Sequence, residues 1–485
     1  ATATASADLT TVTVDGFETL NFAANSGDAT LAATADRTSV SFTSASTLET
    51  VNLSGSKSVN LDASSNAVKL ATINAANVVG GAVIATGAVT QALTVTGSGV
   101  VDQITVNTVG AGGSATVNAG AGKDVITATI ANATAAVIDG GADADTMVLT
   151  DTSAADGGIT VSDAMFNDMD VETVDFSGSQ AGDLIWTVGG FADSMATRNG
   201  NVLGITSDTN VTASAADDIT IDASAMSAGN SVSVDIKNTA AAAPKVSNIA
   251  VTGSDGNDVI KLTEAFASSA NVITASGGAG DDTITLVTTN SQDGALIVNG
   301  GAGNDTIDLT GATSDAAVTA NLVTPGSGND IIKLDADAAN TKVTIVTGST
   351  AALTGELTIS NFTGGATADV LKIDAFLNAT AMNGPLTANP GATTAATSDV
   401  NLLVDIAGGE DITTAAGLTA ALAGEGEYGN VDMGASGSAV FVTAATNNAA
   451  ETQYVFFATS DAGGTITAVS VGTITSFDID DFNAA

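Results

Sequence analysis

Residues 277–308 read GGAGDDTITLVTTNSQDGALIVNGGAGNDTID and contain one nonapeptide pattern twice, at 277–285 and at 300–308. In both copies a glycine-rich bend ends in an aspartate, Asp282 or Asp305, and a short apolar strand follows. Apolar and polar residues alternate in that strand, as they do in a half-buried β-strand. A bend of fixed order that recurs at an even spacing is typical of a solenoid in which each repeat forms one coil.

Six clear copies of this bend occur along the chain, and a looser seventh precedes them. The last four terminal aspartates are 24, 23 and 25 residues apart, and the first clear pair is 21 residues apart. A second apolar strand lies before each bend, as at 271–276 and 295–299, so we expect two strands in each coil and the acidic bends along one edge. The terminal aspartates are Asp102, Asp124, Asp145, Asp258, Asp282, Asp305 and Asp330.

Acidic side chains dominate the charge. The chain has 53 Asp plus Glu against 11 Lys plus Arg, a formal net charge of −42, and 44 of the acidic residues are Asp. Asp favours turns and binds hard cations, whereas a merely solvated acidic surface would contain more Glu. This charge disfavours nucleic acid and anionic membranes as partners, because phosphate contacts need Lys or Arg. The apolar fraction of 44%, with only 4% aromatic residues, predicts an ordered chain with a narrow core.

The chain contains no Cys and no His. Disulfides, thiolate metal sites, the Ser-His-Asp and Cys-His arrangements and nearly all zinc-enzyme ligand sets are therefore excluded. No apolar run approaches the roughly 20 residues that span a bilayer, so we expect no membrane insertion. We predict that the chain is not an enzyme.

Calcium is the ion that these bends suit. It takes about six to eight oxygen ligands from carboxylates and main-chain carbonyls, and alternate glycines allow positive φ, so that carbonyls can turn toward an ion. One bend offers too few oxygens, so we expect each ion to bridge two stacked bends and to add to the free energy of folding. The other expected metal-binding residues of the bends are Asp143, Gly253, Asp255, Gly277, Ala279, Gly280, Gly300, Ala302, Gly303, Ser327 and Gly328.

The copies resemble the repeat Gly-Gly-x-Gly-x-Asp-x-apolar-x of RTX (repeat-in-toxin) proteins, and the resemblance implies a calcium-binding parallel β-roll. Some copies depart from it. Asp143 stands where the repeat has a glycine, Ala119 and Pro325 replace the first glycine, and Ser254 replaces the second. We expect altered or empty sites there. RTX rolls usually place two nonapeptides in each coil, so the plainer alternate strand of this chain implies ion sites along one edge only.

The resemblance covers about residues 95–150 and 246–335, and residues 359–373 look like the segment that follows RTX arrays. The C-terminal segment 478–485 is similar to uncleaved signals for type I export, which would make an N-terminal signal unnecessary. Strands of the form Glu-Thr-apolar-Asn or Asp, together with the Thr/Ala/Gly/Asp-rich composition, resemble bacterial surface-layer (S-layer) proteins. By resemblance, the protein is secreted to the cell surface of a Gram-negative bacterium.

The predicted fold class is all-β, a parallel β-roll or β-solenoid with RTX-type calcium turns and a short helix near 412–422. The expected parts are a Thr/Ser/Val-rich β-solenoid region with few metal turns (1–115), the first RTX-type turns (116–150), an irregular β spacer (151–245), the main calcium-binding β-roll (246–350), and a C-terminal cap with the export signal (351–485).

The leading functional hypothesis is a structural protein that folds on binding calcium and self-assembles into a surface layer, so its partner is another copy of itself. A cell-surface polysaccharide is left open as a second partner. One alternative is a calcium-stiffened RTX adhesin. Another is the RTX half of a secreted hydrolase, against which the lack of His and of a Gly-x-Ser-x-Gly motif counts. A third is that the bends are ordinary hairpin turns whose carboxylates only cap backbone amides.

Overall fold

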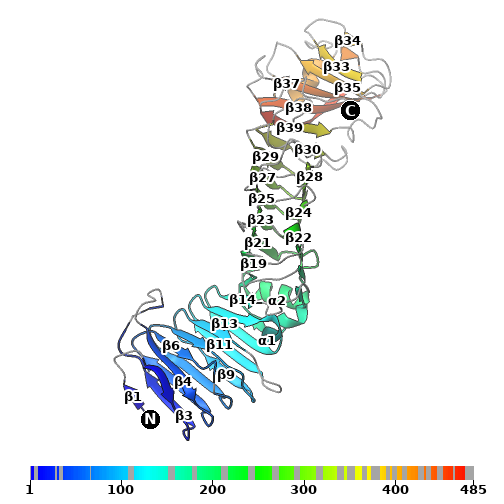
Figure 1. Ribbon diagram of the computed structural model, residues 1–485. Helices are drawn as coiled ribbons and strands as arrows, with labels where there is room; N and C mark the ends of the chain where they lie inside the picture. The colour runs from blue at the N-terminus through cyan, green and yellow to red at the C-terminus, as the bar shows by residue number, and fades with distance from the viewer. Residues whose placement is uncertain are drawn as a thin grey trace. The chain divides into compact units, whose positions relative to one another are not determined.

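Figure 1 shows the computed structural model, in which short parallel strands stack coil upon coil as a β-solenoid. Contacts divide the chain into two units, Ala1–Ala240 and Ala241–Ala485. The structure describes residues 2–4, 9–27, 30–31, 37–65, 67–107, 114–150, 159–176, 183–208, 217–238, 246–264, 272–288, 295–312, 321–335, 343–346, 356–362, 369–372, 383–388, 394–395, 401–406, 412–423, 431–432, 438–444, 452–461 and 465–475.

Two parallel sheets form most of the coils of the first unit. One contains, in order, β1 (Thr2–Thr4), β3 (Thr19–Ala23), β5 (Thr50–Gly55), β7 (Thr72–Val78), β9 (Leu93–Thr96), β11 (Ala115–Ala121), β13 (Ala136–Ala142) and β16 (Met169–Asp170). The other contains β2 (Leu9–Thr13), β4 (Thr38–Ser44), β6 (Val59–Asp62), β8 (Ala82–Ala85), β10 (Gln103–Val106), β12 (Val125–Thr129), β14 (Thr146–Thr150), β17 (Thr173–Asp175), β19 (Val202–Asp208) and β21 (Ser231–Asn238).

The end of the first unit adds three further strands and its helices. Strands β15 (Ile159–Val161), β18 (Leu184–Thr187) and β20 (Asp217–Asp222) pair in parallel. Helix α1 (Ile130–Thr134), the 3₁₀ helix η1 (Asp163–Phe166) and helix α2 (Gly190–Arg198) interrupt the coils. Here Trp186 is fully buried and stacks on Phe166, with ring centroids 5.0 Å apart, while the ring edge of Phe176 approaches it at 5.5 Å. These large rings fill a wider core than Ala and Val could fill.

The second unit repeats the two-strand coil. One sheet contains β22 (Val246–Thr252), β24 (Val272–Ala279), β26 (Ala295–Ala302), β28 (Asn321–Ser327), β30 (Val343–Val346) and β32 (Val370–Lys372). The other contains β23 (Val259–Glu264), β25 (Thr283–Thr288), β27 (Thr306–Gly311), β29 (Asp330–Lys333) and β31 (Leu357–Ser360). Figure 1 shows the two sheets as opposite sides of one stack.

The C-terminal part of this unit departs from the simple coil. Strand β31 pairs with β39 (Ile466–Thr475), and β39, β38 (Thr452–Ser460) and β37 (Ser438–Ala444) form an antiparallel meander. Beyond β37 lie β35 (Asn401–Ile406) and β33 (Asn383–Ala388), and β34 (Thr394–Ala395) pairs with β36 (Val431–Asp432). Helix α4 (Ala415–Leu422) begins at the Thr414 cap and belongs to a core cluster that includes Phe441 and Phe456. The short helix predicted near 412–422 is confirmed.

Alternation of apolar and polar residues sets the inside and outside of each coil. In β24 and β25 the side chains of Ile273, Ala275, Ile284 and Leu286 are fully buried, while the residues between them are partly exposed. The parallel register pairs Ile284 with Ile260 in one neighbouring coil and with Ile307 in the other. Like residues therefore stack on like, and each fully buried Ile or Leu stabilises the fold by roughly 1.5–3 kcal/mol.

The predicted all-β solenoid with two strands in each coil is confirmed. The export segment expected at 478–485 lies outside the described residues. The described part of 151–245 consists of parallel strands, η1 and helix α2. Among the described residues, none of the helices is long and apolar enough to cross a membrane.

Candidate functional site

In the second unit the terminal aspartates of the bends form one row. The backbone N–H of Asp258 donates to Oδ1 of Asp282 at 2.7 Å, that of Asp282 to Asp305 at 2.9 Å, and that of Asp305 to Asp330 at 3.0 Å. These residues are at most 2% exposed. Each carboxylate therefore reaches one coil back and holds the amide of its counterpart, and the structure brings four of the predicted site residues together.

The first unit contains a similar row. The N–H of Asp102 donates to Oδ1 of Asp124 at 2.7 Å, and the N–H of Asp124 donates to Oδ1 of Asp145 at 2.8 Å. The N–H of Asp145 then donates to Oε2 of Glu172 at 2.5 Å. Glu172 thus continues the row after the last bend, a role that the sequence analysis missed because this residue belongs to the Glu-Thr strand type.

In four of these aspartates only one carboxylate oxygen accepts a hydrogen bond. Oδ2 of Asp124, Asp145, Asp282 and Asp305 is buried and accepts no hydrogen bond. An unsatisfied buried acceptor costs about 1–3 kcal/mol, and more when it is charged, so buried polar atoms without partners need a physical explanation. Capping of backbone amides explains Oδ1 and leaves Oδ2 unexplained.

Burial also shifts the acidity of these groups. Burial, aided by the charges of Asp258, Asp305 and Asp281, raises the pKa of Asp282 from 3.8 to about 8. Burial likewise raises the pKa of Asp305 to about 6. In the first unit it raises the pKa of Asp124 to about 7 and that of Asp145 to about 6. Burial therefore makes the ionised form of these carboxylates unfavourable, and a bound proton or cation would lower the free-energy cost of burying them.

Glycines allow the bends to stack directly on one another. Gly278 and Gly301, at the second position of their bends, have φ of +118° and +115°, and a Cβ built on Gly301 would collide with the carbonyl oxygen of Gly278. Asp143 holds φ of +82° at the fourth position, where other bends have glycine. Its side chain is exposed. Asp143 therefore keeps the positive-φ conformation of the glycine it replaces, at a cost in backbone strain.

The first-position glycines make room for the carboxylates. A Cβ on Gly277 or Gly300 would overlap Oδ2 of the aspartate in its own bend, and the same holds for Gly253. The carbonyls of Ala302 and Ser327 accept the N–H of Gly280 and Gly303, at 2.7 and 2.8 Å. Because a carbonyl has two lone pairs, each keeps one for a second partner.

The remaining predicted ligands contribute less. Ala279 and Gly328 are partly exposed parts of the stacked bends, and Asp255 is exposed. Within the described residues, no three Asp, Glu, His or Cys side chains gather as a metal cluster. Any cation in these bends would therefore rely on one buried carboxylate oxygen per bend together with main-chain carbonyls. That donor set suits a hard, oxygen-preferring cation.

A second row, on the exposed side of the bends, joins the coils in the opposite direction. Oδ1 of Asn257 accepts the N–H of Asp281 at 2.9 Å, and Oδ1 of Asp281 accepts that of Asn304 at 2.7 Å. Asn304 and Asn329 continue the row, each at 2.8 Å, to the N–H of Asn329 and Glu356. The sequence analysis missed this row, although an Asn or Asp at the fifth position of each bend of the second unit was the available signal.

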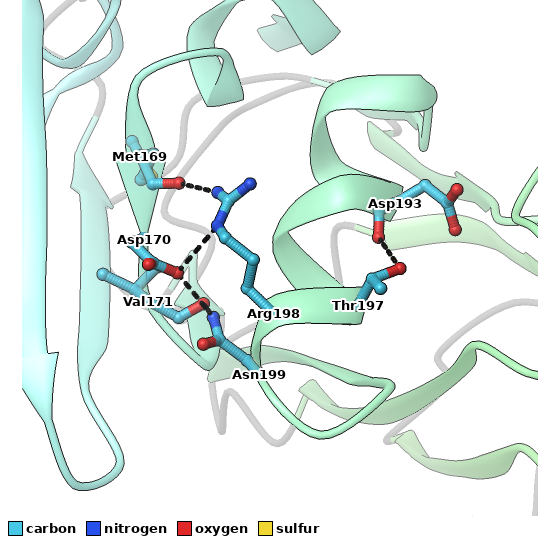
Figure 2. A network of polar contacts seen from close by, with 7 residues as sticks. All are labelled: Met169, Asp170, Val171, Asp193, Thr197, Arg198 and Asn199. Atoms are coloured by element: carbon cyan, nitrogen blue, oxygen red, sulfur yellow. Dashed lines mark hydrogen bonds and ion pairs between the residues drawn. The ribbon is translucent and has the colours of Figure 1, made fainter.

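A separate polar network ties the end of helix α2 to strand β16 (Figure 2). Nε of Arg198 lies 3.4 Å from Oδ1 of Asp170, and Arg198 also donates to the carbonyl of Met169 at 2.7 Å. Asn199 donates to Asp170 at 3.1 Å and to the carbonyl of Val171 at 2.8 Å. The charged groups are each more than two-fifths exposed. Exposed ion pairs of this kind contribute about 0–1 kcal/mol to the free energy of unfolding, and this network attaches the C-terminal end of helix α2 to strand β16.

Asp193 of the same helix shows what a fully satisfied buried aspartate looks like. It accepts hydrogen bonds from the N–H and hydroxyl of Ser227, at 2.9 and 2.6 Å, and from the amide of Asn230 at 2.6 Å. Burial acts to raise the pKa of Asp193, but these hydrogen bonds outweigh burial and hold the pKa below 3.8. Asp124, Asp145, Asp282 and Asp305 lack such donors at Oδ2, and burial raises the pKa of each of them.

Comparison of the chain with protein-family models finds no match, and neither do comparisons with curated proteins and with solved structures.

Proposed function

We propose that this protein is a calcium-binding structural protein of the RTX kind, whose acidic bends fold tightly when calcium is present. The observation that carries the proposal is the set of four buried Oδ2 atoms without hydrogen-bond partners, on Asp124, Asp145, Asp282 and Asp305. They occur at the same position of their bends, and beside Asp145, Asp282 and Asp305 the first-position glycine, Gly140, Gly277 or Gly300, leaves room for this oxygen. The net charge of −42 adds to the need for counter-charge.

The chain's own residues would supply the binding groups. The carboxylates of the four aspartates would hold calcium through Oδ2 while Oδ1 keeps its bond to the backbone N–H one coil earlier. Main-chain carbonyls of the glycine bends would complete the oxygen set. A bound calcium supplies positive charge that offsets the cost of buried carboxylates. Coil-to-coil contact then becomes stronger with metal than without it.

Double replacement of Asp282 and Asp305 by Ala tests this proposal in calorimetric titrations with calcium chloride and in thermal melts. We expect fewer bound ions and a lower melting temperature in calcium. In chelator we expect little change, because losing the hydrogen bonds to Asp258 and Asp282 offsets the removal of two buried charges.

Asp308→Ala is the matched control, because Asp308 lies on the strand after a bend and pairs with Lys333 at 3.8 Å. It should leave calcium binding unchanged. Equal losses of stability in calcium and in chelator for the double variant would show that the two aspartates serve packing and not ion binding.

We further propose that the folded protein is secreted and assembles with copies of itself into a surface layer. The support is the resemblance of the strands and composition to S-layer proteins, together with a β-solenoid whose regular strand faces repeat from coil to coil. Electron microscopy of the purified protein in calcium should show ordered sheets that dissolve in chelator. Monomers that stay dispersed in calcium and adhere to cells or to surface polysaccharide would favour the adhesin.

A further inference from the structure

The bends form two arrays, one at 97–145 and one at 253–330, and the first bend of each array differs from all that follow it. In 97–102 and in 253–258 the second position is a serine, Ser98 or Ser254, and we call these two bends the serine turns. The five later bends, called the glycine turns, have glycine at that position. They are 119–124, 140–145, 277–282, 300–305 and 325–330.

Each serine binds the aspartate that ends its own turn. The N–H of Ser254 donates to Oδ2 of Asp258 at 2.5 Å, and its hydroxyl lies 2.9 and 3.1 Å from Oδ1 and Oδ2. Ser98 makes the corresponding bonds to Asp102, with its N–H on Oδ2 and its hydroxyl 2.9 Å from Oδ1. Asp102 also accepts the N–H of Ala82 at 2.5 Å. In the serine turns, therefore, the oxygen left bare in four glycine turns has a donor.

The backbone of the serine turns differs as well. In all five glycine turns the second residue has φ between +100° and +118°, and the fourth residue has φ between +82° and +133°. Neither position has positive φ in the serine turns. There the serine oxygen accepts an N–H from the fourth residue, Gly256 at 3.0 Å and Val100 at 3.3 Å. The serine side chain thus fixes a local turn by its own hydrogen bonds.

Burial is the same in both kinds of turn, so it does not explain the difference. Ser98, Ser254, Asp102 and Asp258 are all at most 4% exposed, as are the aspartates of the glycine turns. What differs is the source of the groups that satisfy the carboxylate. The protein supplies them in a serine turn, whereas four of the five glycine turns leave one buried carboxylate oxygen without a donor.

We infer that Ser98 and Ser254 make the first turn of each array independent of metal, so that each array starts from a turn that is ordered before calcium binds. This inference rests on the proposed function, because it assigns calcium to the glycine turns only. The serine turn then has an ordered backbone, without metal, against which the next coil can stack. Its serine carbonyl lies against the second-position glycine of that coil, Gly120 or Gly278.

Hydrogen exchange of the full chain, read by mass spectrometry in chelator and in calcium chloride, tests the inference. In chelator we expect the amides of 253–258 to be protected at least about tenfold more strongly than those of 300–305, because local stability differs along a structure. In calcium both turns should be protected. Ser254→Ala should abolish the difference in chelator, Ser254→Thr should keep it, and Ser327→Ala, a serine at the third position of a glycine turn, should not affect it.

Ser254→Gly provides a second readout if Ser254→Ala does not fold. It converts the serine turn into a glycine turn, and native mass spectrometry in calcium should then count more bound ions than in the wild type. An unchanged ion count would overturn the inference. So would equal exchange of all turns in chelator, with calcium protecting every turn, although that result leaves the proposed function intact. If calcium changes the exchange of no turn, the proposed function fails, and the inference fails with it.

Discussion

Asp282→Asn is the most informative single substitution, because it should change stability in opposite directions with and without calcium. Asn keeps an oxygen that can accept the N–H of Asp258, now 2.7 Å from Oδ1, and it removes the buried charge. In calcium the variant should be less stable than the wild type, because a carboxylate ligand is lost. In chelator at alkaline pH it should be more stable.

The size of the gain in chelator follows from the pKa. Burial raises the pKa of Asp282 from 3.8 to about 8, and each unit corresponds to about 1.4 kcal/mol, so the ionised carboxylate costs the metal-free fold up to about 6 kcal/mol above pH 8. The amide loses about 1 kcal/mol of hydrogen-bond strength and leaves a buried NH₂ group unpaired, at about 1–3 kcal/mol. The net stabilisation expected near pH 9 is therefore about 2–4 kcal/mol.

Urea denaturation followed by circular dichroism measures this difference. Asp281→Asn is the control, because it removes the neighbouring charge from an exposed side chain and leaves the buried oxygen in place. Asp281 contributes to the raised pKa of Asp282, so the control should show a small stabilisation in chelator and almost no change in calcium. Destabilisation of Asp282→Asn by the same amount in both buffers would refute the reasoning.

Three further outcomes are expected. In chelator the wild type should lose stability as pH rises, because burial raises the pKa of Asp124, Asp145, Asp282 and Asp305 to between about 6 and about 8. The stability that comes from protonating these carboxylates is fully present below pH 3.8 and is lost as the pH rises from 3.8 to about 8. Saturating calcium should flatten this pH profile. A urea midpoint that rises with pH in chelator would contradict this. Gly301→Ala should cost at least about 1–3 kcal/mol from its φ alone, plus the collision with the carbonyl of Gly278, whereas Gly99→Ala, with open space around its Cβ, should cost little in the same melts. Trp186→Ala should cost about 3–5 kcal/mol because the side chain is fully buried, and Phe191→Ala, at 43% exposure, should be nearly neutral; equal effects would show that the Trp186 cluster is not a packed core.

The repeat spacing made the solenoid predictable. Bends spaced 23 to 25 residues apart, each followed by an alternating strand, leave little freedom once the strands are parallel, because a slip of one residue would turn the apolar side chains outward. Ile260, Ile284 and Ile307 therefore stack as the sequence suggests. The antiparallel meander of β37, β38 and β39 was not predictable in this way, since alternation is the same in parallel and antiparallel strands.

The candidate site was only partly predictable for a different reason. The sequence identified the aspartates but not which of their oxygens have partners, because that depends on the backbone angles of the bend. Ser254 looked like a defect in the repeat, and the structure shows that it supplies both a hydroxyl and an N–H to Asp258. Glu172 could not be assigned from spacing, since it lies 27 residues beyond Asp145 and outside any bend.

The two rows of the second unit explain how such an acidic edge can keep its register. The exposed row contains three asparagines, Asn257, Asn304 and Asn329, and one aspartate, Asp281, so its coil-to-coil bonds carry little charge and need no ion. The buried row contains only aspartates, and its free oxygens bring the repulsion. Because the two rows donate in opposite directions along the stack, each bend is held from both neighbours even when the buried carboxylates repel one another. Calcium would then determine how strongly neighbouring coils are held together, while the asparagine row determines the register in which the bends stack.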